Sequence, residues 1–536
     1  MVITPQTNIK LLKVPFEMDN NNQLTFSNAT AQYNYFNGLT NKLEYDSCTY
    51  QRKDGYMAIN EDADTLQGYN YCMYQNTQYG NKWFYAFITN ITYEGNEVSY
   101  VYIKTDVFQT WQFDITWKRS FVEREHVNDD TIGLHTVPEN LETGEYIANS
   151  SHDMNLFSTF YICFAVSQKP VITQNTPGAM QVDWQPATRK QYGGVFSGMA
   201  YIVTDTVNHA SEFIKLYDDQ AKSDAIQSVF IIPTAFTSGL TWYTTTGAFD
   251  IKYAEVNNTS SSYGFSTTVI ARNTTVDGYT PKNNKLFVYP YCYLSLDNNS
   301  GNCLTLNYED FASGITFSVD GTLTQGCSIK MTPLSYKKVA VNHLYSIMLG
   351  KLPICSWQSD EYANWIRQNC INIGLNVIGS AGQIIAGGVL ASTGAGSLAG
   401  AGQIANGIMG VASTLGQIYE HSLVPPSVQG NLNGGDVNYA LGLYNPILYQ
   451  LSIKSEYAQI IDNFFSMYGY KTNKLKLPNI SGRTNWNYVK TIGCNIVGDI
   501  PQKDLQELKS IFDNGVTLWH NASTFLDYSQ TNSIVS

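Results

Sequence analysis

The sequence predicts a mainly β, or β-rich α+β, multidomain protein with a few helices and one long apolar, glycine-rich segment. Three observations support this prediction. The chain holds 38 tyrosines and many Asn and Thr residues, a mixture that favours strands joined by polar turns. Apolar and polar residues alternate over long stretches, as they do in half-buried strands. With 536 residues, the chain is also too long to fold around one hydrophobic core.

The first strand-rich region extends from Leu24 to about Trp117. Its sequence alternates with a period of two between Gly, Asn and Asp residues, and Glu94-Gly-Asn predicts the turn of a hairpin. The charged stretch RSFVERE at 119–125 follows, and a polar region with turn signals then reaches about Thr176. The N-terminal region is therefore expected to form sheet structure.

The middle of the chain mixes the two periodicities. Residues 211–230 show the apolar spacing of a helix, and FIIPTAF at 230–236 follows as an expected strand. Residues 285–311 return to strand alternation, which continues to about Ala340.

Helix signals concentrate in the last third of the chain. Residues 360–370 are amphipathic, and a second amphipathic stretch at 455–469 has Ser455 as its expected N-cap and Gly469 as its end. A further helix is expected within 500–520. The expected apolar face of the 455–469 helix comprises Tyr457, Ile460, Ile461, Phe464 and Phe465.

The most unusual feature is a run of 52 residues, 368–419, without a charged side chain, in which 12 residues are glycine. As helices, its halves 371–390 and 398–419 would each span about 30 Å, the thickness of the hydrocarbon core of a bilayer. Soft turn residues, STGAGS, join the two halves. The segment thus has the shape of two membrane-length arms connected by a flexible tip.

This segment has four possible interpretations: a disordered linker, a permanent membrane anchor, a buried helical hairpin, and a sequestered loop that becomes membrane-active. Its many Ile, Leu and Val residues argue against a disordered linker. Each glycine costs about 0.8–1 kcal/mol relative to Ala in a helix interior, which argues against a permanent membrane helix. We favour the sequestered loop and keep the buried hairpin as the alternative. The expected plug and membrane-active residues are Ile371, Ile373, Gly382, Ile384, Ile385, Gly387, Gly388, Val389, Leu390, Gly396, Leu398, Gly400, Ile404, Ile408, Met409, Val411, Leu415 and Ile418.

Composition narrows the possible functions. Charged residues make up 14% of the chain, against about 25% in typical soluble proteins, which suits surfaces buried in an assembly. The net charge of −12 argues against a surface that grips nucleic-acid phosphates, although DNA can slide past an acidic wall. Nine scattered cysteines without CxxC, and no apolar leader, indicate reduced thiols in a protein made in a cytoplasm.

We expect no enzyme activity, no cofactor and no metal site, because no GxSxG, P-loop or HExxH pattern occurs. Glu123 and Glu125 are interpreted as solvated charges rather than a catalytic acid pair. Asp62 and Asp64 are interpreted as a surface turn, because the glycine and terminal Glu of a calcium loop are missing. The seven histidines form no HxH or HExxH pair and are interpreted as structural or exposed residues. The alternative for His126, beside Glu125, is a pH sensor that titrates near 6.5.

Several motifs, taken in order, carry a resemblance to a known family. They are YGNKWFYAFIT (79–89), DVFQTWQFDI (106–115), FVEREHV (121–127), VYPYC (288–292), YGYK (468–471), NYVKT (487–491), GDI (498–500), DLQE (504–507) and IFDNGVTLWH (511–520). In this order they resemble the distal tail-knob protein of small short-tailed bacteriophages (podophages) that infect Gram-positive bacteria. The local similarity is strongest over residues 30–130 and 440–520.

The resemblance implies a homohexameric tail-knob tube whose terminal regions build β-barrel tube domains. It implies that the apolar loops plug the lumen and then insert in the host cytoplasmic membrane as a pore for genome ejection. Implied partners are the proximal tail tube, a tip or wall-degrading protein, and phage DNA in transit without sequence-specific binding. The protein would belong to the virion tail, after synthesis in the host bacterial cytoplasm. The alternatives are a host-glycan receptor-binding tail protein, a stand-alone pore-forming protein and a wall hydrolase.

The expected domain organisation combines this resemblance with the element pattern. It comprises the first part of a tube β domain (1–125), a knob or middle insertion domain (126–284), a second tube-type β domain (285–360), the apolar plug (361–430) and a C-terminal part that completes the tube domains (431–536).

Overall fold

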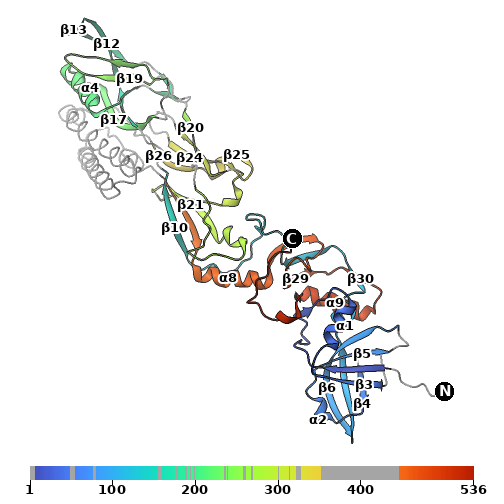
Figure 1. Cartoon of the computed structure of the whole chain (residues 1–536). Helices are drawn as coiled ribbons and strands as arrows, with labels where there is room; N and C mark the ends of the chain where they lie inside the picture. The colour runs from blue at the N-terminus through green and yellow to red at the C-terminus, as the bar shows by residue number, and fades with distance from the viewer. Residues whose placement is uncertain are drawn as a thin grey trace, which may run out of the picture. The chain divides into compact units, whose positions relative to one another are not determined.

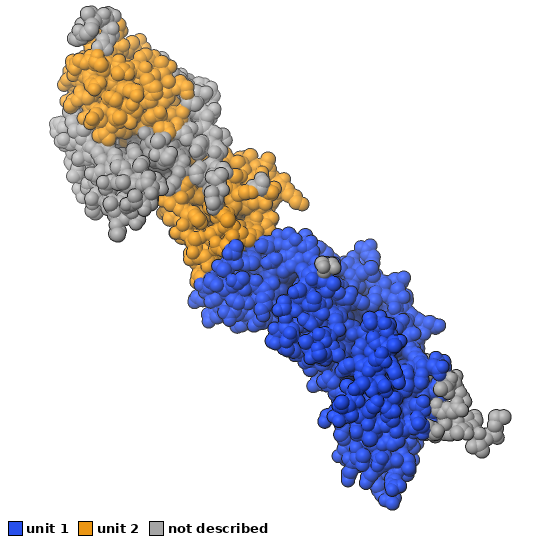
Figure 2. All heavy atoms as spheres, in the orientation of Figure 1, with its two compact units in different colours: residues 1–145, 274–291, 453–536 blue, residues 146–273, 292–452 orange. Residues whose placement is uncertain are grey.

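The computed structural model describes residues 7–351 and 446–535, apart from short gaps at 49–54, 77–79, 155–159, 177–178, 188–189, 193–194, 198, 235–236, 238, 257–260, 267–269, 300, 313 and 322–327. The chain divides into two compact units (Figure 2). Unit 1 contains residues 1–145, 274–291 and 453–536, and unit 2 contains residues 146–273 and 292–452. Strands dominate both units, so the predicted fold class is confirmed. The finer five-part division stays a prediction.

The N-terminal part of unit 1 is a six-stranded antiparallel sheet of order β3-β1-β5-β6-β7-β4 (Figure 1). The predicted hairpin is confirmed: β6 and β7 pair across a turn at Asn96 and Glu97. Short helices α1 (Ala29–Asn37), α2 (Ala63–Leu66) and α3 (Val107–Trp111) accompany the sheet. The strands are β1 (Thr7–Leu12), β3 (Lys42–Cys48), β4 (Gly55–Ile59), β5 (Tyr71–Asn76), β6 (Trp83–Gly95) and β7 (Val98–Thr105).

The second sheet of unit 1 brings strands from both ends of the chain together. Its order is β2-β31-β29-β9-β28, and β9 lies within the charged stretch RSFVERE. Trp486 and Trp519, paired across β29 and β31, are fully buried and pack with Phe36 and Tyr71 of the N-terminal part. β8 (Ile115–Trp117), which precedes β9 in the chain, pairs with β30 (Ile496–Gly498), which follows β29. The strands of the second sheet are β2 (Asn22–Leu24), β9 (Ser120–Glu125), β28 (Tyr470–Lys476), β29 (Trp486–Ile492) and β31 (Val516–Trp519).

Both C-terminal helices occur where the sequence predicts them. α8 (Ser455–Tyr468) ends at Gly469, whose φ of 65° and close approach to the Glu125 backbone leave no room for a Cβ atom. α9 (Gln502–Asn514) ends at Gly515. Two details of α8 were wrong. Ser455 is the first helical residue, and its N–H is instead satisfied by Asp277 Oδ2 at 2.9 Å. Ile460 is 67% exposed, so it does not belong to the buried face.

Unit 2 contains three larger sheets, of order β10-β27-β21-β22, β17-β11-β16-β19-β18 and β20-β23-β24-β25, with β26 paired to β24. Helix α4 (Val207–Asp219) begins before residue 211 and ends well before residue 230, because β17 starts at Ile226. The strands are β10 (Tyr146–Asp153), β11 (Phe160–Val166), β16 (Ala200–Thr204), β17 (Ile226–Pro233), β18 (Trp242–Thr244), β19 (Lys252–Glu255), β20 (Ser261–Ser266), β21 (Cys292–Asp297), β22 (Cys303–Leu306), β23 (Thr316–Gly321), β24 (Ser328–Tyr336), β25 (Val339–Val341), β26 (Ile347–Lys351) and β27 (Ile447–Ile453). The described residues of unit 2 also form two separate hairpins, β12 (Gln168–Thr176) with β13 (Ala179–Pro186) and β14 (Lys190–Tyr192) with β15 (Val195–Ser197).

Candidate functional site

The described strands that precede and follow the apolar segment in the sequence, β26 (Ile347–Lys351) and β27 (Ile447–Ile453), belong to one hydrophobic core of unit 2. β26 precedes the segment and pairs with β24, whereas β27 follows it and pairs with β21. Leu349 of β26 and Leu448 of β27 are both buried and belong to the same core cluster, which also contains Leu296 and Met331. Strand pairing and side-chain burial therefore fix the residues on either side of the segment within one compact unit.

The predicted plug residues, from Ile371 to Ile418, lie outside the described residues, and so does the helix expected at 360–370. Within residues 7–351 and 446–535, no helix combines the length and the apolar character that are needed to cross a bilayer. The role of residues 371–418 as a plug stays a prediction.

A buried polar junction connects the three stretches of chain that make up unit 1. We define it by Arg124, Glu139, Lys285, Asp462 and Tyr470. The Glu139 carboxylate is completely buried and forms ion pairs with both Lys285 and Arg124. One of its oxygens also accepts the backbone N–H of Lys471 at 2.9 Å. Burial lowers the pKa of Lys285, and the adjacent Glu139 carboxylate opposes that shift.

Aromatic rings and backbone groups enclose these charges. The Arg124 guanidinium donates to the carbonyl of Gly469 at 2.7 Å and lies 4.7 Å from the ring centroid of Phe464. Lys285 Nζ lies 5.3 Å from the ring centroid of Tyr470. Charges that are paired, hydrogen-bonded and covered by rings can remain buried, whereas removal of one partner leaves the other unpaired in the interior.

Asp462 of helix α8, in the stretch 453–536, joins this stretch to residues 274–291 of unit 1. Its carboxylate is fully buried and accepts a hydrogen bond from Tyr279 Oη at 2.7 Å. It also accepts the backbone N–H groups of Lys282 at 2.7 Å and Asn283 at 3.0 Å, and the Asn283 side-chain amide at 2.8 Å. Four donors therefore satisfy one carboxylate, which compensates for its removal from water.

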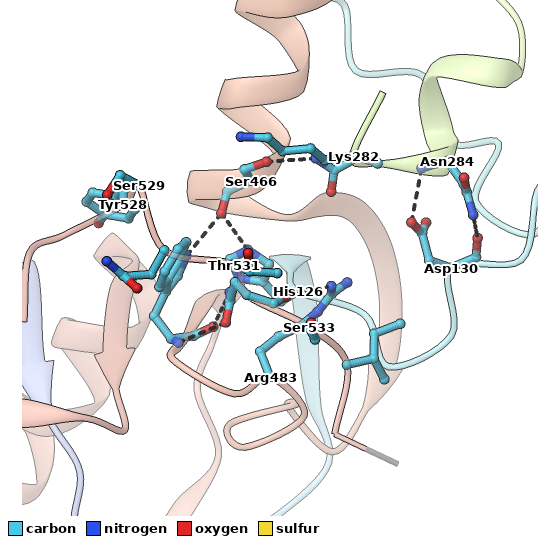
Figure 3. A pocket seen from close by; sticks show the side chains of 15 residues that line it. His126, Asp130, Lys282, Asn284, Ser466, Arg483, Tyr528, Ser529, Thr531 and Ser533 are labelled. Atoms are coloured by element: carbon cyan, nitrogen blue, oxygen red, sulfur yellow. Dashed lines mark hydrogen bonds between the residues drawn. The ribbon is translucent and has the colours of Figure 1, made fainter. Parts of the chain in front are cut away.

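Tyr470 links the junction to the first stretch. Its hydroxyl donates to Asp130 Oδ1 at 2.6 Å, and the other carboxylate oxygen of Asp130 accepts the backbone N–H of Asn284 at 3.0 Å. The Asn284 side chain returns a hydrogen bond to the carbonyl of Asp130 at 2.7 Å (Figure 3). Residues 126–145, which contain no helix or strand, are thus held by side chains rather than by a regular backbone ladder.

The interpretation of Glu123 and Glu125 as solvated charges was wrong for Glu125. Glu125 is fully buried, forms an ion pair with Lys476 and accepts the backbone N–H of Asn479 at 2.8 Å. Glu123 is partly exposed and forms an ion pair with Lys490 at 2.9 Å. The bulges that interrupt β9 against both neighbouring strands explain why the simple alternation of side chains fails here.

A cavity of about 510 Å³ opens beside the junction, between helix α8, the strand β29 region and the C-terminal residues 528–534 (Figure 3). Asn532 forms one wall of this cavity: its side-chain oxygen accepts the N–H of Trp486 at 3.1 Å, and its amide donates to the carbonyl of Trp486 at 2.8 Å. Arg483 donates to the carbonyls of Val127 at 3.1 Å and Asn532 at 3.3 Å. The polar groups that line the cavity thus hold its own walls together.

His126 lines this cavity and is fully buried within unit 1. Its Nδ1 accepts the backbone N–H of Tyr488 at 2.7 Å, so the proton sits on Nε2, which donates to the carbonyl of Ser466 at 3.1 Å. Burial, together with the nearby positive charge of Arg483, lowers the pKa of His126 to about 3. The interpretation of His126 as a structural residue is therefore confirmed, and the alternative of a sensor that titrates near 6.5 is wrong.

This low pKa predicts a pH-dependent loss of stability. The unfolded chain binds a proton on this histidine near pH 6.5, whereas the folded chain does so only near pH 3. Stability is therefore present above about pH 6.5 and decreases as the pH falls toward 3, by up to about 1.4 kcal/mol per pH unit. We expect His126→Gln to flatten this slope in urea unfolding between pH 7 and 4, with hydrogen exchange reporting on unit 1.

The control is His343→Gln, a change at an exposed residue of unit 2. It is expected to leave the slope of the unit 1 amides unchanged. An identical slope in wild type and His126→Gln would contradict the assignment of this histidine as neutral and buried.

Other sequence-based expectations concern single residues. Asp62 and Asp64 are exposed, so their expected surface position is confirmed, but they begin helix α2 rather than form a turn: Asp62 caps the helix by accepting the N–H of Asp64. Cys72, Cys292 and Cys494 are buried, and burial raises the pKa of each thiol to about 12, which suits reduced structural cysteines. Among the described residues, no group of three or more His, Cys, Asp or Glu side chains is arranged to hold a metal ion.

Comparison with known proteins gives matches over almost the whole chain. A family model described as the C-terminal domain of the Bacillus phage phi29 tail knob protein gp9 matches residues 252–533, and one described as the caudoviral major tail protein N-terminus matches residues 5–117. The tail knob protein gp9 of Bacillus phage B103 is 27% identical, over 97% of this chain and 97% of that protein. The tail knob protein gp9 of Bacillus phage phi29 is also 27% identical, over 96% of each chain.

A solved structure shares the fold. The structure of the bacteriophage C1 tail knob protein, gp12, matches with a TM-score of 0.62 and 16% identity, and the match covers 99% of this chain and 100% of that one. At this identity the match shows a common fold across both units.

Proposed function

Because the chain belongs to the tail knob protein family of phi29-like Bacillus phages, and is thus a structural component of a virion tail, we propose that it builds a homohexameric tube at the distal end of a short tail. In this proposal the tube is the channel for genome ejection. The apolar segments of the six copies plug the lumen and, on ejection, insert in the host cytoplasmic membrane as a pore. The other tail proteins of the virion are its assembly partners.

One observation carries the proposal: the strands before and after the uncharged, glycine-rich segment belong to the same packed core. Leu349 and Leu448 are buried in that core on strands that flank the segment. A segment attached in this way can change its surroundings while unit 2 remains folded, because neither anchor strand has to unpair. Movement from a lumen filled by neighbouring copies into lipid exchanges one apolar environment for another.

A ring also provides what a single chain lacks. Six copies would bring 72 glycines (six times 12) and their Ile, Leu and Val neighbours into one interior. There the segments can cover one another from water, and burial of apolar surface contributes roughly 25 cal/mol per Å². A monomer would have to hide the same surface alone, although charged residues make up only 14% of the whole chain.

The size of the particle in solution tests the proposal directly. We expect mass photometry and electron microscopy of the full chain to show hollow rings of about six copies. A chain that stays monomeric at micromolar concentration would contradict the proposed tube.

A further inference from the structure

We propose that the outer face of the β28–β9–β29 sheet in unit 1 is a docking surface for a second copy of this chain. The surface of that copy which fits it is the tyrosine-rich, acidic face formed by β4, β6 and β7. This inference rests on the proposed ring and deepens it, because it names the surfaces by which neighbouring copies pack.

Three large apolar side chains lie next to one another on the outer face of the sheet. Phe121 of β9 pairs directly with Leu475 of β28 on one side and with Ile492 of β29 on the other. Direct partners in an antiparallel ladder point to the same face, so the three side chains form a continuous row across three strands. They are 38%, 60% and 58% exposed, respectively. We call these residues the apolar row.

The apolar row is unexpected on the solvent face of a sheet whose other face is already occupied. Val122 and Val489, on the same strands, are completely buried in the core of unit 1. A sheet that covers a core on one face normally carries polar side chains on the other. Contiguous apolar surface of this kind marks an interaction site.

The edge of the same sheet is protected against pairing, which leaves the face as the docking surface. β28 is the last strand in the sheet order, and it carries Lys471, Lys474 and Lys476. Asn473, with a φ of 48°, lies at the bulge that interrupts its pairing with β9. Lysines and bulges at an edge strand prevent the addition of another strand.

The charges around the apolar row identify the kind of partner. Arg119 is exposed and precedes Phe121 by two residues, which places it on the same face as the row, in a chain whose net charge is −12. The Arg119 guanidinium donates to the carbonyl of Leu475 at 3.1 Å, which holds a positive charge against the row. A partner with an aromatic, acidic surface therefore fits this site.

The same chain carries such a surface on the N-terminal sheet. Tyr56 of β4 is 45% exposed. Its ring stacks on that of Tyr100 with centroids 4.3 Å apart, and its centroid lies 5.6 Å from that of Tyr102. Glu94 and Glu97, both exposed, lie at the adjacent β6–β7 turn. Two different, complementary surfaces on one chain produce a head-to-tail contact, and such contacts form closed rings when the rotation closes.

The test removes the apolar row without disturbing the strands. Threonine has high strand propensity, so Phe121→Thr, Leu475→Thr and Ile492→Thr are combined in one full-length variant. Mass photometry over a concentration series is expected to show that this variant needs at least tenfold more protein for half-assembly than wild type. The matched control, Val339→Thr with Val341→Thr, changes two exposed strand residues of unit 2 and is expected to assemble like wild type.

Charge reversal provides a second, independent measurement. Arg119→Glu and Glu97→Lys are each expected to weaken assembly, and the two changes together in one chain are expected to restore it in part. If wild type does not assemble, the ring itself is wrong. If wild type forms rings and the triple threonine variant forms them equally well, the ring stands and the docking surface proposed here is wrong.

Discussion

Replacement of Glu139 by Ala is expected to lower the free energy of unfolding of unit 1 by about 3–5 kcal/mol, the range for removal of one partner from a buried ion pair. The wild-type carboxylate is fully buried and neutralises both Lys285, which is 2% exposed, and Arg124, which is 13% exposed. Without it, two positive charges remain in the interior, and the N–H of Lys471 loses its acceptor. Urea unfolding monitored by hydrogen exchange of the β9 and β28 amides measures this effect within unit 1 alone.

The control for this prediction is Glu142→Ala, a change of the same type at an exposed position of the same irregular stretch. Its effect is expected to stay within about 0.5 kcal/mol, as for most surface substitutions. Glu139→Ala combined with Lys285→Met is expected to be less destabilised than the sum of the single changes, because one unpaired charge is removed. Equal effects of Glu139→Ala and Glu142→Ala would contradict the description of the junction.

The elements that the sequence predicts well are those set by local signals. The hairpin near Glu94 follows from strand alternation on both sides of a Gly-Asn pair, and β6 and β7 pair as expected. Helices α8 and α9 follow from apolar spacing and from the glycines that end them. These patterns lie within a few residues of one another, so a single sequence is sufficient to detect them.

The elements that the sequence does not predict depend on partners far away in the chain. RSFVERE is a charged stretch, yet it becomes the strand between β28 and β29, whose residues lie more than 340 positions later. Glu125 is buried only because Lys476 and Asn479 reach it from that distant region. The periodicity of the local sequence cannot predict a contact with such a distant part of the chain.

The polar junction was missed for the same reason. Asp462 lies beside Ile461 on the buried side of α8. From the sequence alone, an acidic residue in an amphipathic helix is assigned to the polar, exposed face. Lys285, which begins the otherwise apolar run KLFVYPYC, was the one local signal that could have indicated a buried cation. The pKa of His126 could not be predicted from the sequence for the same reason. Burial and the charge of Arg483 determine this pKa, and the residues next to His126 in the sequence indicate neither.

Deletion of residues 371–419 is expected to abolish the ability of the protein to permeabilise membranes. The deletion removes the uncharged apolar arms but keeps the anchor strands β26 and β27, whose Leu349 and Leu448 hold the core of unit 2. Unit 2 should therefore fold as in wild type, which hydrogen exchange of β24 and β21 verifies. A second variant, in which residues 371–419 are replaced by a Ser/Gly linker of equal length, separates the loss of apolar character from the shortening of the loop.

Release of an encapsulated dye from phospholipid vesicles is the measurement that tests the central claim most directly. Vesicles are exposed to intact protein and to both variants, at neutral and at mildly acidic pH. We predict dye release by the intact protein once the assembly opens, and release at background level by the deletion and by the Ser/Gly variant. If the deletion variant releases dye as well as the intact protein does, the apolar segment is not the membrane-active part of this tail knob.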